Sequence, residues 1–154
     1  MGLKHCRIAD FWQRNTMDTP ISPYVETRGM YYFARMLDKI RRHAASQLRE
    51  DFQKNVGKAL DERCALYLGV AYAGIATRTL EGGSDEAIFD WCCENGRRLG
   101  EADILIWNEY ARKIGWNDTR TDMLATYKAE SGLSHRDDIL TMFDFMNADE
   151  GRGA

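Results

Sequence analysis

Six cationic side chains gather in one short stretch of this 154-residue chain, where they could bind an anion together. They are Arg28, Arg35, Lys39, Arg41, Arg42 and Arg49. Asp38 is the single carboxylate among them, which leaves the stretch a net charge of +5. Guanidinium groups bind phosphate or carboxylate through paired hydrogen bonds, and Tyr31 or Tyr32 would supply a ring for stacking. The chemistry that this stretch predicts is anion binding.

The spacing of apolar residues predicts a helix over the same stretch, residues 29–48. The apolar residues that recur three and four positions apart are Met30, Phe33, Leu37, Ile40, Ala44 and Leu48. At about 100° per residue, the opposite side of this helix carries a second stripe. Its members are Tyr31, Arg35, Asp38, Arg42 and Arg49. We expect this polar stripe to face solvent.

Three roles are open for Arg35, Asp38, Lys39 and Arg42. In the first role, these residues form a solvated face, in which ion pairs three or four residues apart contribute about 0.2–0.5 kcal/mol each. Alternatively, Arg35 or Asp38 pairs with a neighbouring helix of the same molecule. The third role is a surface that binds a partner.

The charge of the rest of the chain bears on which partner such a surface would take. The whole chain has a net charge of −3, which argues against nucleic acid as the partner. From Glu101 onward, eleven carboxylates face six Lys or Arg, a net charge of −5. The basic helix and this acidic half are therefore expected to attract each other, within one molecule or between two.

The tryptophans suggest a second candidate site. Trp91, Trp107 and Trp116 lie on or beside apolar stripes and are expected to anchor the core or an interface. A pocket between the helices that carry Trp107 and Leu37 would place Arg35 and Asn108 near its mouth, where they could orient a small acidic ligand.

No catalytic motif is present, and the sequence favours a protein without catalytic activity, cofactor or metal. His43 and His135 are expected at the surface, and the carboxylate pair Asp137 and Asp138 suits a helix start. The four cysteines form no C-x-x-C pair and are expected to be free buried thiols; they are Cys6, Cys64, Cys92 and Cys93. His5 beside Cys6 is the single Cys/His neighbour pair.

Cap and breaker residues divide the remainder into further helices. Gly69 splits residues 61–80 into two short helices, and Ser84 and Gly96 bound the next one. A wide apolar stripe over residues 101–114, including Leu105, Ile106 and Tyr110, predicts a central helix. Two more helices are expected, over residues 119–131 and from Ser134 onward, the second with a capping box between Ser134 and Asp137. No segment alternates with the period of a strand.

The fold class is therefore all-α, a compact orthogonal bundle of about six to seven helices without a sheet. Length and composition suit one domain. We expect an amino-terminal segment over residues 1–22 and a single helical domain over residues 23–154. No apolar run is long enough for a signal peptide or a membrane span, which predicts a cytoplasmic protein.

Four segments together resemble a bacterial family of small helical proteins, a domain of unknown function. They are GMYYFARMLDKIRRHAASQL, LDERCALYLG, GGSDEAIFDWCCENG and the Ile-Trp-Asn run at Ile106. The family pattern has an A-R-M-(I/L)-D-K helix, a G-x-(S/D)-D-E-x-x-x-x-W helix and an A-W-N segment, where this chain has Ile106 in place of the alanine. The resemblance covers residues 23–116, with residues 117–154 as a helical extension. It implies a helical fold and no catalytic residue.

Two functions follow from these patterns. The first is a non-catalytic interaction module that binds a protein partner, or itself, through the basic helix face or its acidic counterpart. The alternative is a small-molecule-binding protein or an enzyme, with an anionic ligand, phosphate or carboxylate, held by the basic helix. The candidate binding residues are Arg35, Asp38, Lys39, Arg42, Trp107 and Asn108.

Overall fold

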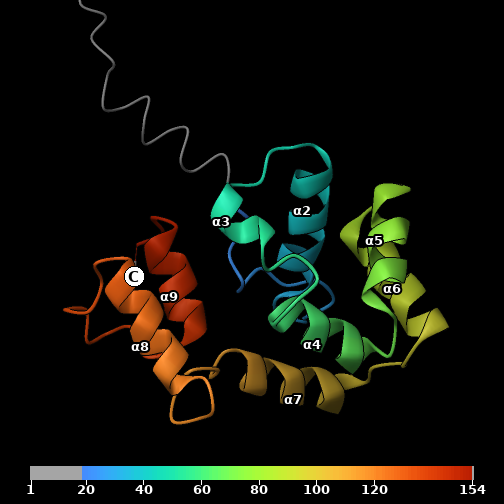
Figure 1. Ribbon diagram of the computed structural model, residues 1–154. Helices are drawn as coiled ribbons and strands as arrows, with labels where there is room; N and C mark the ends of the chain where they lie inside the picture. The colour runs from blue at the N-terminus through green and yellow to red at the C-terminus, as the bar shows by residue number, and fades with distance from the viewer. Residues whose placement is uncertain (1–18, 154) are drawn as a thin grey trace, which may run out of the picture.

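The computed structural model describes residues 19–153, and this part of the chain contains eight α-helices and no strand (Figure 1). The helices are α2 (Phe33–Ala44), α3 (Glu50–Gln53), α4 (Leu60–Leu68), α5 (Tyr72–Leu80), α6 (Asp85–Asn95), α7 (Glu101–Ala111), α8 (Thr121–Glu130) and α9 (Met142–Asp149). The all-α class is confirmed, with one helix more than the upper end of the expected number. Within residues 19–153, no helix combines the length and the apolar character needed to cross a bilayer.

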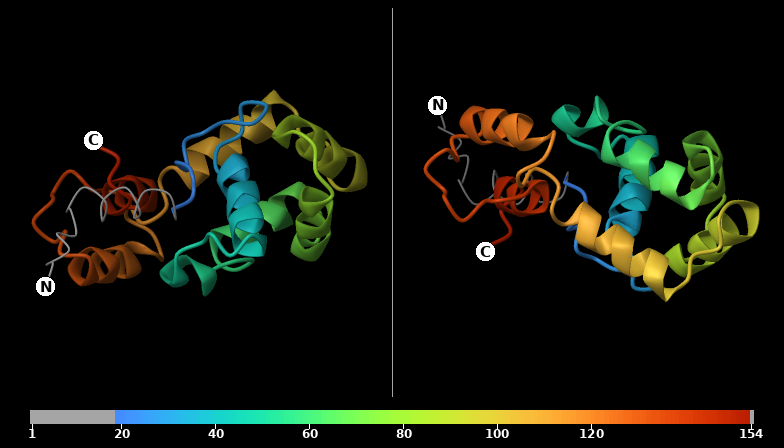
Figure 2. Two further views of the ribbon diagram at one scale, coloured as in Figure 1. Left: turned by 90° about the horizontal axis from the view of Figure 1, so that it is seen from above. Right: turned by 90° about the horizontal axis from the view of Figure 1, so that it is seen from below.

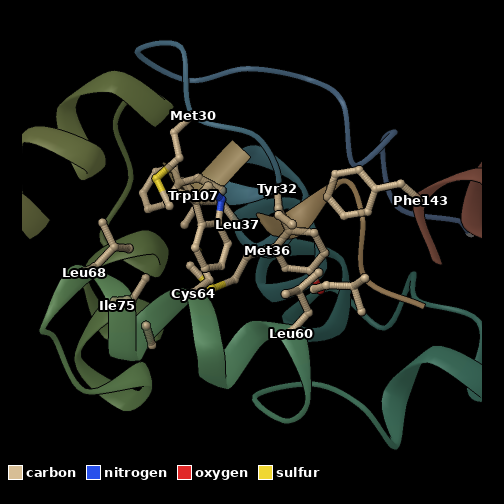
Figure 3. Close-up of a cluster of buried hydrophobic side chains, with 14 of the residues drawn as sticks. Met30, Tyr32, Met36, Leu37, Leu60, Cys64, Leu68, Ile75, Trp107 and Phe143 are labelled. Carbon is tan, nitrogen blue, oxygen red and sulfur yellow. The ribbon is translucent and has the colours of Figure 1, made fainter. Parts of the chain in front are cut away.

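Helix α2 occupies the middle of the molecule. In two perpendicular directions of view, α8 and α9 lie at one end and α5 and α6 at the other, with α2 between them (Figures 1 and 2). Met36 and Leu37 of α2 point toward Trp107 of α7 and Cys64 of α4, and all four side chains are buried (Figure 3). Burial of such side chains is the main source of stability in a helical domain.

Local signals set several helix ends as predicted. Gly69 ends α4 with a left-handed φ of 70°, a conformation that glycine adopts without steric cost. The Ser84 side chain accepts a hydrogen bond of 3.1 Å from the amide of Ala87 and so caps α6. Gly96 ends α6 where a Cβ would collide with the Leu68 carbonyl oxygen, so a larger residue cannot occupy this position.

The first long helix begins later than predicted. Residues 27–30 form a tight turn, with hydrogen bonds of 3.1 and 2.9 Å between Thr27 and Met30. Tyr32 then adopts a left-handed conformation and Phe33 is the first helical residue. Met30 is buried, as its spacing suggested, but it reaches the core from the turn.

The helix expected to start at Ser134 begins at Met142 instead. Thr141 and Asp144 form a capping box with the same spacing as Ser134 and Asp137, and the amide of Met142 is bound to the Ile114 carbonyl at 2.7 Å. Two equivalent capping signals lay in one segment, and the tertiary hydrogen bond decides between them.

Helix α7 is not the central helix that its apolar stripe predicted. Trp107 and Ala111 are buried, whereas Leu105 is 62% and Ile106 61% exposed. Tyr110 is also exposed, at 43%. The additional apolar residues therefore face outward and leave the central position to α2.

Candidate functional site

Arg35 does not face solvent, so the prediction of a solvent-facing polar stripe is wrong for this residue, and the neighbouring candidate cation Lys39 is buried as well. Arg35 is 2% exposed and Lys39 is 4% exposed. The end of α9 and the first turn of α4 supply the carboxylates that pair with them. The role that the structure shows for Arg35 is the second of the three considered, a pair with another helical segment.

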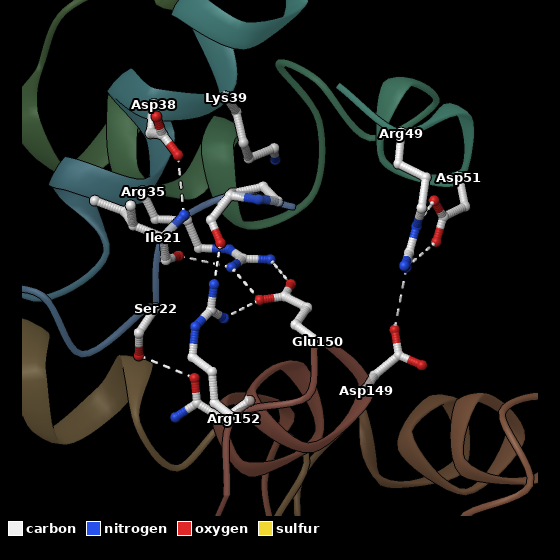
Figure 4. Close-up of polar contacts among 12 residues, drawn as sticks. Ile21, Ser22, Arg35, Asp38, Lys39, Arg49, Asp51, Asp149, Glu150 and Arg152 are labelled. Atoms are coloured by element: carbon white, nitrogen blue, oxygen red, sulfur yellow. Dashed lines mark hydrogen bonds and ion pairs between the residues drawn. The ribbon is translucent and has the colours of Figure 1, made fainter. Parts of the chain in front are cut away.

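Arg35 is held by Glu150, at the carboxyl end of α9. Its Nη1 donates to Glu150 Oε2 at 2.9 Å and to the Ile21 carbonyl at 2.8 Å, and its Nη2 donates to Glu150 Oε1 (Figure 4). The Arg152 guanidinium also donates to Glu150 and to the Pro20 carbonyl. Burial alone would lower the pKa of Arg35, but the hydrogen bonds and charge of Glu150 outweigh it and raise that pKa. The acidic half of the chain thus meets the basic helix within one molecule.

Lys39 is held by Asp61, in the first turn of α4. Its Nζ donates to Asp61 Oδ2 at 2.7 Å, and both side chains are at least 95% buried. The Tyr32 hydroxyl donates to Asp61 Oδ1 at 2.8 Å, and the Gly57 amide donates to Oδ2 at 3.0 Å. Burial lowers the pKa of Lys39 and raises that of Tyr32 well above its ordinary value. The result is a buried Tyr-Asp-Lys cluster.

Asp38 and Arg42 form the ion pair four residues apart that their spacing suggested. Arg42 Nε lies 2.8 Å from Asp38 Oδ2, and this carboxylate also accepts a hydrogen bond of 2.9 Å from the Ile21 amide. Both side chains are half-buried. They fasten the segment before α2 to the helix.

Trp107 and Asn108 hold the turn that precedes α2. Trp107 Nε1 donates to the Tyr31 carbonyl at 2.9 Å. The Asn108 side chain accepts from the Tyr31 amide at 2.9 Å and donates to the Gly29 carbonyl at 2.8 Å. Neither lines the cavity that Arg35 borders, so the structure separates these two candidates from the cations of α2.

That cavity, of about 150 Å³, lies between α2–α4 and the segment that runs from the end of α7 through α8 to α9. Its apolar wall includes Phe52, Leu60, Ile114, Met123, Tyr127, Met142, Phe145 and Met146. The cations on its lining are Arg35, Lys39, Lys58, Arg63 and Arg120, and no carboxylate is among the lining residues. Sequence reasoning identified Tyr32, Arg35 and Lys39 but missed the other lining residues, because three separate segments supply the lining.

Three of these cations, here called the outer cations, are Lys58, Arg63 and Arg120. Lys58 is exposed and the other two are half-buried. Arg63 donates to the Tyr110 hydroxyl at 2.8 Å, and Arg120 lies 3.8 Å from the Met123 sulfur. Within residues 19–153, no carboxylate forms an ion pair with an outer cation. Their positive charge is therefore available to an anion.

The two remaining lining cations, Arg35 and Lys39, are here called the inner cations, and both have N–H groups without a hydrogen-bond partner among the described residues. Arg35 Nε is buried without a hydrogen-bond partner among the described residues. The Lys39 ammonium has three N–H groups and makes one hydrogen bond to a described residue. An unmet buried donor costs about 1–3 kcal/mol, so an acceptor-bearing ligand would be stabilised here.

The backbone beside the cavity is strained at two lining residues. Tyr32 has φ 72° and ψ −27°, and Ala59 has φ 53° and ψ −118°. Such conformations cost about 1–3 kcal/mol in residues other than glycine and tend to occur at functional sites. Tyr32 directly precedes α2 and Ala59 directly precedes α4, and the Tyr32 hydroxyl donates to Asp61.

Neither the cysteines nor the carboxylates form a metal site in the described part of the chain. No group of three or more His, Cys, Asp or Glu side chains gathers there in a way that could hold a metal ion. Cys64 and Cys92 are free and buried, as expected, and Cys93 is free and half-buried. The pair of His5 and Cys6 lies outside the described residues.

Comparison with known families matches residues 17–152 to the domain of unknown function DUF5069. The match extends beyond the resemblance seen in residues 23–116 and includes both Arg120 and Glu150. No curated protein matches the chain. The cavity and the charges around it therefore carry the functional argument.

Proposed function

We propose that this chain, which belongs to the DUF5069 family of domains of unknown function, binds a small organic anion with an apolar body in the cavity between α2–α4 and α8–α9. The observation that supports this most strongly is the lining: five cations, no carboxylate and an otherwise apolar wall. The outer cations hold the anionic group, and the methionines and aromatic rings enclose the rest of the ligand.

The volume limits the ligand to about the size of one aromatic ring. A cavity of about 150 Å³ holds benzene in another protein, and drug-sized ligands need about 300–1,000 Å³. Met123, Met142 and Met146 have flexible, polarizable side chains that adapt to the shape of a ligand. A ring or a short alkyl chain with one carboxylate fits these limits.

Burial argues against the basic helix as a surface for a protein partner. Arg35 and Lys39 are covered and paired with Glu150 and Asp61. The more exposed Arg28 and Arg41 are also in ion pairs, with Asp90 at 2.9 Å and Asp85 at 2.7 Å. These charges are satisfied within the molecule, whereas those of the outer cations are not.

Calorimetric titration with matched pairs of ligands tests the proposal. The members of each pair share the same apolar body, and one carries a carboxylate where the other carries a neutral hydroxymethyl group: 4-methylbenzoate against 4-methylbenzyl alcohol, and hexanoate against hexanol. We expect each anion to bind at least roughly tenfold more tightly than its alcohol, a difference of about 1.4 kcal/mol. Absence of binding by both anions at about 10 mM, a binding free energy of roughly −3 kcal/mol, would refute the proposal.

Two variants locate the binding. The double substitution Lys58→Gln and Arg120→Gln removes two outer cations and is expected to weaken the anions while leaving the alcohols unchanged. Lys54→Gln is the matched control, because Lys54 is exposed and does not line the cavity. An equal loss of affinity in the control would show that the anion binds through general surface charge.

A further inference from the structure

The inner end of the cavity holds a primary amine beside a proton acceptor. Lys39 and Tyr32 line the cavity, and Asp61 lies directly behind both of them. Lys39 Nζ is 2.7 Å from Asp61 Oδ2, and Asp61 itself is fully buried. The Gly57 amide and the Tyr32 hydroxyl hold the carboxylate in place. Binding of an anion with an apolar body does not require an amine paired with a buried carboxylate.

We propose that Lys39 forms an imine with the carbonyl carbon of an aldehyde or ketone that also carries the anionic group held by the outer cations. This inference rests on the proposed function, because the same cavity and the same cations position the ligand. It adds the substrate class, a small oxo acid or formyl acid, and a covalent step.

The atoms and charges of this step balance without an oxidant, a reductant or a second reactant. Asp61 takes a proton from the Lys39 ammonium, and the neutral amine attacks the carbonyl carbon. A proton moves from this nitrogen to the former carbonyl oxygen, which gives a carbinolamine. Asp61 then returns its proton to the hydroxyl group, the C–O bond breaks and water leaves. Ammonium and carbonyl have become iminium and water, with one positive charge before and after.

The surroundings favour Lys39 over the other lysines for this step. Its side chain is 5% exposed, and burial lowers its pKa, so a larger fraction is present as the nucleophilic amine than in a lysine exposed to water. The iminium nitrogen keeps the positive charge beside Asp61, so the ion pair survives the reaction. The two N–H groups of Lys39 without described partners leave the nitrogen accessible from the cavity.

Reductive trapping of the wild-type protein tests this inference. The protein is mixed with 4-formylbenzoate and sodium cyanoborohydride, which reduces the iminium ion to a stable secondary amine in preference to the free aldehyde, and the modified lysines are mapped by peptide mass spectrometry. We expect Lys39 to be the main site, although it is buried and Lys54 and Lys58 are exposed. An excess of 4-methylbenzoate, which has a similar shape but a methyl group in place of the aldehyde, is expected to protect Lys39.

The variant Lys39→Arg keeps a cation opposite Asp61 and cannot form the imine, so its trapping is expected to fall to the level of the exposed lysines. Binding of 4-methylbenzoate without labelling of Lys39 would overturn this inference and leave the proposed function standing. Absence of labelling together with absence of binding by both 4-methylbenzoate and hexanoate would overturn this inference and the proposed function. Labelling of Lys39 that persists unchanged under excess 4-methylbenzoate would also overturn it, because the carbonyl would then reach the amine from outside the cavity.

Discussion

Replacing Glu150 with Gln is expected to destabilise the fold by about 3–5 kcal/mol, because it leaves the buried charge of Arg35 without a counter-ion. The Arg35 side chain is 3% exposed and would lose the carboxylate that meets two of its nitrogens. Arg152 is 30% exposed and can turn toward water, so it adds little to the cost. The Ile21 carbonyl, a neutral acceptor for Nη1, would remain. The penalty is therefore that of one stranded charge.

Urea denaturation followed by tryptophan fluorescence measures this cost, since Trp107 is buried. Asp149→Asn is the matched control: it removes the neighbouring carboxylate, whose pair with Arg49 spans 3.5 Å and is partly exposed, and is expected to cost less than about 1 kcal/mol. The double variant Arg35→Met and Glu150→Met leaves no charge stranded and is expected to be more stable than Glu150→Gln. If Glu150→Gln costs no more than Asp149→Asn, Arg35 is hydrated and the reasoning about a covered basic helix fails.

Two further predictions concern the strained turn and a buried thiol. Ala59→Gly is expected to stabilise the protein by about 0.5–1 kcal/mol, because the strain relieved at φ 53° exceeds the added entropy of the unfolded chain. The control Ala102→Gly, on the exposed side of α7, is expected to cost about 1 kcal/mol. Equal losses of stability in thermal unfolding of the two variants would rule out strain at Ala59. Burial raises the pKa of Cys92 from 9.0 to about 12, so the unfolded chain releases this proton first and stability is expected to fall as the pH rises from about 9 toward 12. Urea midpoints below and above pH 9 should show a flatter dependence in Cys92→Ala than in Cys93→Ala, and identical slopes would contradict the assignment.

Local signals made part of the fold predictable. The Ser84 side chain and Gly69 determine helix ends through atoms only a few residues away, and both assignments are confirmed. Where two local signals were equivalent, as in the capping boxes of Ser134 and Thr141, the outcome depended on a distant hydrogen bond to Ile114. Spacing alone contains no information about that bond.

Arg35 and Lys39 were predictable as candidate binding residues, but the rest of the cavity lining and the burial of both cations were not. A helical wheel placed Arg35 on a stripe that was expected to face solvent, but Glu150, which covers it, lies 115 residues away in the sequence. The cavity could not be inferred for the same reason. Phe52, Arg120 and Met146 share no spacing pattern and come together only when three segments pack.

Because the cavity lies between two parts of the fold, hydrogen exchange of the backbone amides can report whether a ligand occupies it. One wall belongs to α2–α4 and the other to α8–α9, so movement of α9 away from α2 would open the cavity. A bound molecule that touches both walls adds its binding free energy to the cost of that separation. Amide hydrogens of α9 should therefore exchange with solvent more slowly in proportion to ligand affinity, while those of α6, far from the cavity, keep their rates. The exchange rate of a single helix would then act as a binding isotherm.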